Sequence, residues 1–440
     1  MKKLFLSFLT VLLPMAAFAD AVEIDGICYN LNSEAKEAEV TSNPNYYSGR
    51  VDIPASIAYD GVEYSVTSIH SEAFSFCSAL TSVSIPSSMT WIKYSAFIFC
   101  RNLTSVYISD IAAWCSIDFT NYASNPLAYG AELYLNGQVI KDLTIPDNVT
   151  KIGAYAFSGC SSLTSVTIPG GVTSIGGWTF SDCISLTSVS IPSSVTSIGG
   201  SAFLGCSSLT SVTIPSGVKT IETGTFRNCT SLTSVTIPGS VKTIGSDAFL
   251  NCSSLTSVTI PGSVTSIEGY AFCLCSSLTS VTIPSGVTMI ERNTFDCCSS
   301  LTSVTIGSSV RYIYSKAFAS CPELTDVFCL AENVPSTESD AFQDTHIEYA
   351  TLHVPDSSID AYKREEPWKN FKDIVSLDIQ SIGNLKYASP AARIDIYSID
   401  GRYVGSAADQ SEAARIINNL PSGTSTIVKK GGKSVKIMVK

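Results

Sequence analysis

Residues 146–306 contain one 23-residue unit written seven times in succession, and this repeat constrains the fold more than any other feature. Read from Pro169, the unit is PGGVTSIGGWTFSDCISLTSVSI, and it begins again at Pro192. A fixed period of about 20 to 50 residues is typical of chains in which each repeat forms one unit of a stack or array. One unit cannot fold alone, because its few buried apolar side chains do not offset the entropy of ordering its backbone. The sequence therefore predicts an elongated body in which neighbouring turns share one core.

The strict period places equivalent residues of successive units in columns. One column is phenylalanine and another is cysteine: Phe157, Phe180, Phe203, Phe226, Phe249, Phe272, Phe295 and Phe318; Cys160, Cys183, Cys206, Cys229, Cys252, Cys275, Cys298 and Cys321. Neighbours in a parallel stack lie about 4.8 Å apart, whereas a disulfide needs its Cβ atoms about 3.8 Å apart and correctly angled. We therefore expect the column cysteines to be buried free thiols. Outside the column lie Cys28, Cys115, Cys273, Cys297 and Cys329, and the sequence does not decide whether these pair or react.

Each unit reads as two short extended segments joined by tight turns. In the segment Leu163–Ile168, residues Val166 and Ile168 should point inward, while Ser165 and Thr167 point outward. Pro169 cannot donate to a sheet ladder and should form the corner. Val172 and Ile175 predict a second short segment, which Gly176 ends. The fold class predicted is a β-rich solenoid of 23-residue units in a right-handed parallel stack.

The two ends of the chain differ from the repeat. Residues 1–19 have the basic start, short apolar run and small-residue cleavage site of a signal peptide, and the run of about 15 residues is too short to span a membrane. Residues 20–50 should form an N-terminal cap that begins with a hairpin at the Asp25-Gly26 pair. The solenoid should extend over residues 51–375, with residues 320–375 as its C-terminal cap. There, Ser357 or Ser358 is placed to cap a short helix, and Trp368 and Phe371 to cover the core.

Two segments interrupt or follow this regular body. Residues 109–141 break the period with an irregular, aromatic-rich insertion that ends in a predicted Asn136-Gly137 hairpin turn. Residues 380–440 have alternating apolar residues and a predicted hairpin about Gly431-Gly432, which indicates a separate small β module.

The repeat I-P-x-x-V-x-x-I-G-x-x-A-F-x-x-C-x-x-L-T-S-V resembles that of bacterial BspA-like leucine-rich repeat proteins over residues 20–375. The insertion between Asp110 and Asn136 is similar to one that this family carries. The resemblance implies a leucine-rich repeat solenoid, a secreted or surface-held protein, and binding of host or neighbouring-cell molecules without catalysis. Eukaryotic leucine-rich repeats have an asparagine ladder, whereas the matching column here holds Gly171, Ser194, Gly217 and Ser240, so helices on the convex side are not expected.

The C-terminal module resembles the sorting domains of the type IX secretion route in two stretches, YSIDGR at 397–402 and LPSG at 420–423. This resemblance implies recognition of residues 380–440 by secretion machinery. The chain departs from the pattern at Thr424-Ser425-Thr426, where such domains usually have apolar and aromatic residues. A plain β appendage without a role in transport is the alternative interpretation.

Catalytic and metal-binding patterns are scarce. Only three histidines occur, and no local signature supports Cys115 as a nucleophile paired with one of them. The cysteine pairs lack the C-x2-C spacing of zinc sites, and the glycine pairs fall at repeat corners rather than in a phosphate-binding loop. The formal net charge of -11 disfavours a nucleic-acid partner. We expect no enzyme activity, no cofactor and no metal.

Three surfaces are candidates for binding a partner. The outward Ser and Thr residues should tile one face, for which a plain solvated β surface is the alternative: Ser165, Thr167, Ser188, Ser190, Ser211 and Thr213 begin the series, which continues to Thr282. A second is the column that the repeat leaves free, namely Tyr155, Trp178, Ser201, Gly224, Asp247, Tyr270, Asn293 and Lys316, in which Tyr155 and Trp178 should be neighbours and form an aromatic platform. The third is the insertion around Trp114 and Tyr122, whose alternative role is to cap the misaligned stack.

The sequence thus predicts a secreted or surface-displayed adhesion protein that presents an extended face to an extracellular protein or glycan. A self-associating structural component of a surface layer or matrix is the alternative, and a secreted cysteine hydrolase is a distant third.

Overall fold

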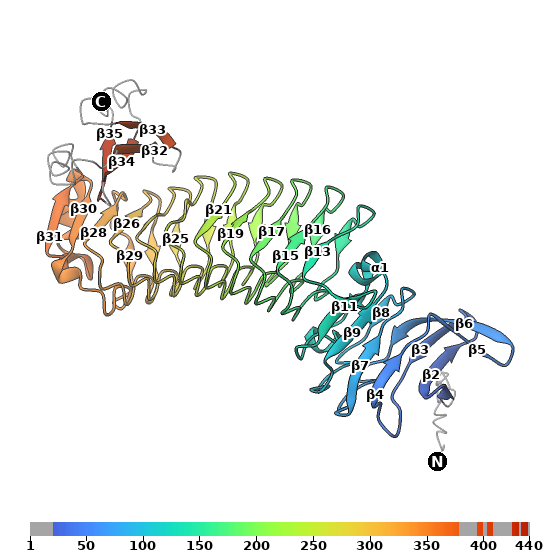
Figure 1. Ribbon diagram of the computed structural model, residues 1–440. Coiled ribbons are helices and arrows are strands. Elements are labelled where there is room, and N and C mark those ends of the chain that lie inside the picture. Colours follow the sequence, from blue (N-terminus) through green and yellow to red (C-terminus); the bar gives the residue numbers. More distant parts are fainter. Residues whose placement is uncertain (1–20, 378–393, 399–402, 408–424, 431–432, 439–440) are drawn as a thin grey trace, which may run out of the picture.

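The computed structural model describes residues 21–377 and the strand residues 394–398, 403–407, 425–430 and 433–438. Figure 1 shows an elongated stack of turns whose axis bends near α1 and β11. The predicted signal peptide lies outside the described residues. Within the described part of the chain, no helix has the length and apolar character needed to cross a membrane.

Nearly every regular turn contributes two short strands, which form two parallel ladders along the stack, each divided into several sheets. The first ladder contains β4 (Gly49–Asp52), β7 (Leu80–Ser84), β9 (Ser105–Ile108), β11 (Glu132–Leu135), β13 (Asp142–Thr144), β15 (Ser165–Thr167), β17 (Ser188–Ser190), β19 (Ser211–Thr213), β21 (Ser234–Thr236), β24 (Ser280–Thr282), β26 (Ser303–Ile306), β28 (Asp326–Cys329), β30 (Thr351–Val354) and β31 (Asp373–Ser376). The second ladder contains β6 (Val62–Ile69), β8 (Trp91–Ile92), β10 (Asp118–Phe119), β14 (Lys151–Ile152), β16 (Ser174–Ile175), β18 (Ser197–Ile198), β20 (Thr220–Ile221), β22 (Thr243–Ile244), β23 (Ser266–Ile267), β25 (Met289–Ile290), β27 (Tyr312–Ile313) and β29 (Ser336–Thr337).

The remaining elements lie at the ends and at the interruption. They are β1 (Val22–Ile24), β2 (Ile27–Asn32), β3 (Glu37–Val40), β5 (Ser56–Tyr59), β12 (Gln138–Val139), the helices α1 (Ile111–Ser116) and α2 (Ile359–Tyr362), the short 3-10 turns η1 (Tyr122–Ser124), η2 (Ile347–Tyr349), η3 (Asp356–Ser358) and η4 (Trp368–Asn370), and the C-terminal strands β32 (Ile394–Ser398), β33 (Tyr403–Ala407), β34 (Ser425–Lys430) and β35 (Lys433–Met438).

The sequence period becomes the register of the ladders. Val166 of β15 pairs with Val189 of β17, and Ser165 pairs with Ser188, each 23 residues apart. This pairing confirms the predicted fold class, a parallel β-solenoid of 23-residue repeats. The unit at 238–260 keeps the alternation of buried and exposed residues but forms no first-ladder strand, and nothing in its sequence explains the difference.

The core contains the phenylalanine column, whose rings stack on one another, and beside it the column of cysteine thiols. From Phe157 to Phe318, consecutive ring centroids lie 5.3 to 5.6 Å apart. From Cys183 to Cys321, each column thiol donates to the phenylalanine carbonyl of the preceding turn, as Cys206 Sγ does to Phe180 O at 3.1 Å. All fifteen cysteines are free thiols, as expected for the column. Burial raises the pKa of the Cys160 and Cys229 thiols to about 12.

Hydroxyl groups also tie successive turns together. Before many first-ladder strands a threonine Oγ1 donates to the carbonyl of the threonine one turn earlier, as Thr187 does to Thr164 at 3.1 Å. At the position of the eukaryotic asparagine ladder, Ser194 Oγ donates to Val172 O at 2.7 Å. These bonds satisfy backbone carbonyls at the turns. Serine at this position therefore provides part of the backbone hydrogen bonding that asparagine provides in eukaryotic repeats.

Both ends of the solenoid are closed by elements that depart from the repeat. At the N-terminus, β1 and β2 form the predicted hairpin, with Ile24 opposite Ile27. At the C-terminus, Trp368 and Phe371 contact the Phe342 ring edge-on, with centroids 5.7 and 5.6 Å away. Ser358 precedes α2 as predicted but makes no capping bond, because its hydroxyl donates to Glu332 O instead.

The C-terminal strands form an antiparallel sheet in the order β33-β32-β34-β35. Lys430 pairs with Lys433, as expected for a hairpin about Gly431-Gly432. The LPSG stretch at 420–423 lies outside the described residues.

Candidate functional site

The free column is a column of left-handed turn residues. All eight positions from Tyr155 to Lys316 have φ between 54° and 64°. The conformation is fixed by the next turn, because each backbone N–H from Tyr155 to Asn293 donates to a carbonyl there; Trp178 N, for example, donates to Gly200 O at 3.0 Å. Bulky residues rarely adopt this conformation, which suits glycine and asparagine.

Tyr155 and Trp178 form the stacked pair that the sequence predicts. Their ring centroids are 6.2 Å apart and the ring planes differ by 17°. Tyr155 is partly buried against the core, which raises the pKa of its hydroxyl, whereas the side chain of Trp178 is 36% exposed. On the side of Trp178 away from Tyr155, the next two positions of the column hold Ser201 and Gly224, so small side chains follow the indole there.

Tyr270 is exposed but lies apart from this pair. It lies four turns beyond Trp178 in the column, and its immediate neighbours there are Asp247 and Asn293. Asp247 forms an ion pair with Arg227 at 3.0 Å. Tyr270 therefore cannot extend the Tyr155–Trp178 platform and would make a separate contact.

The insertion candidates divide between core and surface. Trp114 was expected as a possible contact residue, but only 1% of its surface is exposed, and its indole N–H donates to Ala156 O at 2.7 Å. Its ring packs edge-on against Phe119 within the hydrophobic core. Trp114 therefore plugs the core at the interruption and is not available to a partner. Tyr122 is 37% exposed, with its hydroxyl donating to Ala128 O.

The insertion is less irregular than its sequence indicates. β10 continues the second ladder beside β8, and β11 continues the first ladder beside β9, with Tyr134 opposite Tyr107. β11 and β12 form the predicted Asn136-Gly137 hairpin, and the chain then enters β13 directly. Three strands, β11 to β13, therefore follow β10 before the second ladder resumes at β14.

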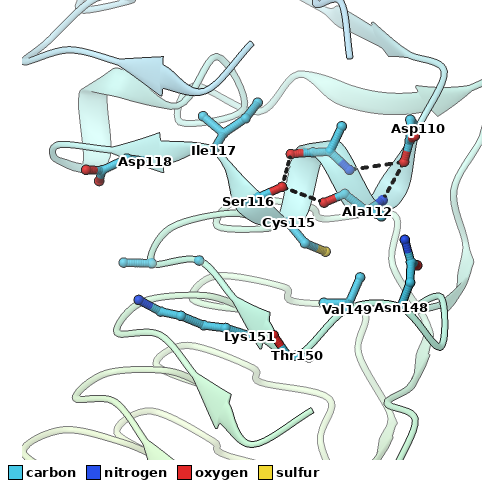
Figure 2. A pocket seen from close by; sticks show the side chains of 13 residues that line it. Asp110, Ala112, Cys115, Ser116, Ile117, Asp118, Asn148, Val149, Thr150 and Lys151 are labelled. Atoms are coloured by element: carbon cyan, nitrogen blue, oxygen red, sulfur yellow. Dashed lines mark hydrogen bonds between the residues drawn. The ribbon is translucent and has the colours of Figure 1, made fainter. Parts of the chain in front are cut away.

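A cleft opens in the second ladder at this point. It has a volume of about 690 Å³ and lies between α1 with the start of β10 on one side and the segment 148–154 on the other. Figure 2 shows Asp110 and Asp118 at the two ends of the upper wall, with Asn148 and Lys151 on the lower wall. Sequence reasoning did not predict this cleft. The sequence feature that could have indicated the cleft is a pair of first-ladder motifs, at 131–135 and 141–145, with no V-x-x-I segment, and therefore no second-ladder strand, between them.

The hydroxyl face is present where it was predicted. Thr167, Ser188, Ser190, Ser211 and Thr213 are exposed and Ser165 is half-buried. Ser165 donates to Asp142 Oδ1 at 2.6 Å. The face ends at Ser303 and Thr305 of β26, which are buried.

A further exposed pair of aromatic residues was missed. Phe76 and Phe99 lie just before the cysteines of their turns, also with positive φ, and their rings are 4.8 Å apart. Their exposed fractions are 60% and 37%. Regular turns have residues such as Asp182 and Asn228 at this position. Phenylalanine at this position in two successive turns could therefore have indicated an exposed aromatic pair.

The geometry gives no support to a cysteine nucleophile. Cys115 is buried, and desolvation raises the pKa of its thiol to about 12, which disfavours the reactive thiolate. His353 pairs with Asp326 at 3.0 Å and stacks on Phe328, which places it in a structural contact. Over the described residues, no group of three or more His, Cys, Asp or Glu side chains is arranged to hold a metal ion.

Comparison with known proteins places this architecture in a family. The model of the "BspA type Leucine rich repeat region" matches six copies over residues 56–123, 130–256 and 242–363. Similar solved structures include a leucine rich cell surface protein from Faecalibacterium prausnitzii A2-165 (26% identity, 83% of this chain and 97% of that chain, TM-score 0.46). Others are a leucine-rich repeat protein from Bacteroides ovatus ATCC 8483 (25%, 81% and 100%, 0.46) and the pneumococcal vaccine antigen PcpA (17%, 82% and 99%, 0.46). No curated protein matches the chain. Because the family model matches more than half of its length, the chain belongs to the BspA-type leucine-rich repeat proteins.

Proposed function

We propose that the protein is a secreted or surface-displayed, non-enzymatic adhesion protein that holds an extracellular protein or glycan against the Tyr155–Trp178 pair. The observation that carries the proposal is the placement of two large aromatic rings at left-handed turn positions. A bulky residue there costs about 1 to 2 kcal/mol relative to ordinary backbone conformations. Strain of this kind often accompanies a functional site, and glycine occupies the same position at Gly224.

The chemistry of the pair suits recognition. Stacked, partly exposed aromatic rings offer a large apolar area at a small cost in side-chain entropy. The neighbouring Ser201 and Gly224 leave space beside the indole, and the hydroxyl face along the first ladder supplies hydrogen-bonding groups at the 23-residue period. The similar protein from Faecalibacterium prausnitzii is a leucine rich cell surface protein, which agrees with display outside the cell.

The test is binding of the purified mature chain to a glycan array and to immobilised purified mucin, with Trp178→Ala and Tyr155→Ala as variants. Loss of an aromatic anchor of this kind should weaken binding about tenfold or more. The matched control is Tyr312→Ala, which removes the exposed ring of another stacked pair, Tyr312–Tyr314, with centroids 6.4 Å apart. Equal retention by the parent and by the double variant would refute the role of the pair, and assembly of the chain alone into large particles would favour the structural alternative.

We further propose that residues 380–440 direct display at the surface through secretion machinery. Deleting these residues should leave the protein in the periplasm while its solenoid stays folded, because the solenoid has its own C-terminal cap at Trp368 and Phe371. Cell fractionation with an antibody to the solenoid measures this distribution. Normal surface display of the shortened protein would contradict the proposal and favour a plain β appendage.

A further inference from the structure

The cleft between α1 and β14 is bordered by sheet edges that lack partners. Among the described strands, β14 ends its sheet and pairs only with β16, while β10 ends its own sheet and pairs only with β8. Sheets also end within the regular turns, at β18, β20, β23 and β25, whereas β16 has a strand on both sides. The end at β14 is distinguished by the cleft that lies beside it. The edge of β14 that faces the cleft therefore offers backbone groups to a further strand.

The cleft is closed at one end and open along the rest. Gly153 N donates to Cys115 O at 2.8 Å, and a Cβ at Gly153 would lie 3.0 Å from the carbonyls of Cys115 and Ile117. This tight contact anchors the end of β14 to α1 and to the start of β10. Before Gly153, the Thr150 and Lys151 amides have no hydrogen-bond acceptor among the described residues. An extended segment lying along this stretch would satisfy them.

The size and lining of the cleft suit a polypeptide backbone. A volume of about 690 Å³ accommodates roughly five residues at the usual packing density. The wall formed by α1 has small side chains, Ala112 and Ala113, and Ala154 lies at the opposite side, so a backbone can approach closely. Val149 and Ile117 add an apolar contribution to the lining.

The charges favour a basic guest. Asp118 is exposed and forms no ion pair within the described part of the chain. Residues 21–145, which supply the α1 side of the cleft, contain thirteen acidic and five basic side chains, whereas residues 146–319 contain seven of each. The lining itself contains two acidic residues, Asp110 and Asp118, and one basic residue, Lys151. The field on the α1 side of the cleft is therefore negative and attracts cationic segments.

We propose that this cleft binds an extended, basic segment of a partner polypeptide, which adds to the free edge of β14 as a strand. Backbone hydrogen bonds to Thr150 and Lys151 would hold the segment, and Asp118 would select for a lysine or arginine side chain. This site is separate from the Tyr155–Trp178 platform, so either can fail without the other.

The experiment measures hydrogen–deuterium exchange of the full chain by mass spectrometry, with acetyl-(Val-Lys)3-amide as the probe at millimolar concentration. Exchange in the peptide that covers residues 148–153 should slow about tenfold. The glutamate analogue acetyl-(Val-Glu)3-amide should protect this segment less. A lysine analogue N-methylated at alternate residues keeps the charge but loses backbone donors on one edge, and it should protect little.

Two variants control for the place of binding. Ala113→Trp fills the cleft and should abolish the protection, while Ser197→Trp places the same side chain on β18, where the second ladder is outside the cleft, and should not. Thermal unfolding checks that both variants are folded. Three results would each overturn the proposal: no protection by the probe, equal protection by its N-methylated analogue, or protection that survives in a folded Ala113→Trp variant. The first result would mean that Lys151 only prevents other strands from pairing with this short edge.

Discussion

Ser201 occupies the left-handed column at φ 56° and makes its ladder contact only through its backbone N–H, which donates to Thr223 O at 2.9 Å. Because glycine adopts this conformation without steric cost, Ser201→Gly should stabilise the fold by about 0.5 to 1 kcal/mol. Ser211→Gly, in the strand β19, should instead destabilise it by a similar amount. Urea denaturation of the two variants measures the difference. A loss of stability in Ser201→Gly would show that its side chain, rather than its backbone conformation, matters there.

For single residues, the sequence predicts burial or exposure where a residue belongs to a repeated column. It does not predict burial or exposure for residues outside the repeat. Phe180 and Cys183 were placed in the core because 23-residue spacing leaves each column one environment. Trp114 has no column, and an aromatic residue in an irregular segment can equally cover a surface or fill a core. The left-handed geometry of Trp178 did have a signal, since Gly224 and Asn293 share its column and both tolerate positive φ.

The column of cysteine thiols gives an element-scale prediction about pH. The pKa of the Cys229 thiol rises from its ordinary value of 9.0 to about 12 in the folded protein, because burial penalises the thiolate. Unfolding therefore exposes a group that ionises more easily, so the stabilisation is complete below pH 9 and is lost as the pH rises from 9 towards 12. Each such thiol should lower the free energy of unfolding by about 1.4 kcal/mol per pH unit in that window.

Replacing Cys206 and Cys229 by alanine separates this effect from the titration of tyrosines and lysines. Burial also raises the pKa of Cys206 well above its ordinary value. The double variant should be less stable at pH 8 but should lose about 2 to 3 kcal/mol less than the parent between pH 9.5 and 10.5. Urea denaturation at each pH gives both slopes, and equal slopes would show that these thiols do not remain protonated in the fold.

Also at the scale of elements, both ladders could be predicted from the repeated unit, whereas the cleft could not. The alternation of Ser165, Val166 and Thr167 predicts a half-buried strand wherever the motif recurs. The absence of a second-ladder strand between β10 and β14 depends on how β11 and β12 fold back as a hairpin. A break in the 23-residue period shows where the stack becomes irregular. Whether a cleft opens there, or the axis bends as in Figure 1, depends on how the irregular segment packs against the neighbouring turns.

The whole molecule should tolerate the loss of one complete unit. Deleting residues 215–237 joins Ile214 to Pro238, which restores the sequence frame of the repeat. Phe203 and Cys206 would then meet Phe249 and Cys252 in the same columns. Because each turn contacts only its neighbours, the stack should close with the interfaces it already uses and keep a cooperative thermal transition at a slightly lower temperature.

A deletion of residues 215–226 is the control, because it removes about half a unit. The residues that follow would then be out of register, with first-ladder segments placed beside second-ladder strands. This variant should fail to form the solenoid and should lose the β-sheet signal in circular dichroism. The full-unit deletion should also keep any ligand of the Tyr155–Trp178 pair, since both rings and the adjacent Ser201 remain. It does remove Gly224, so that Asp247 becomes the next residue of the column after Ser201. Unfolding after the 23-residue deletion would mean that the stack depends on long-range features, such as matched caps, rather than on its repeating interfaces.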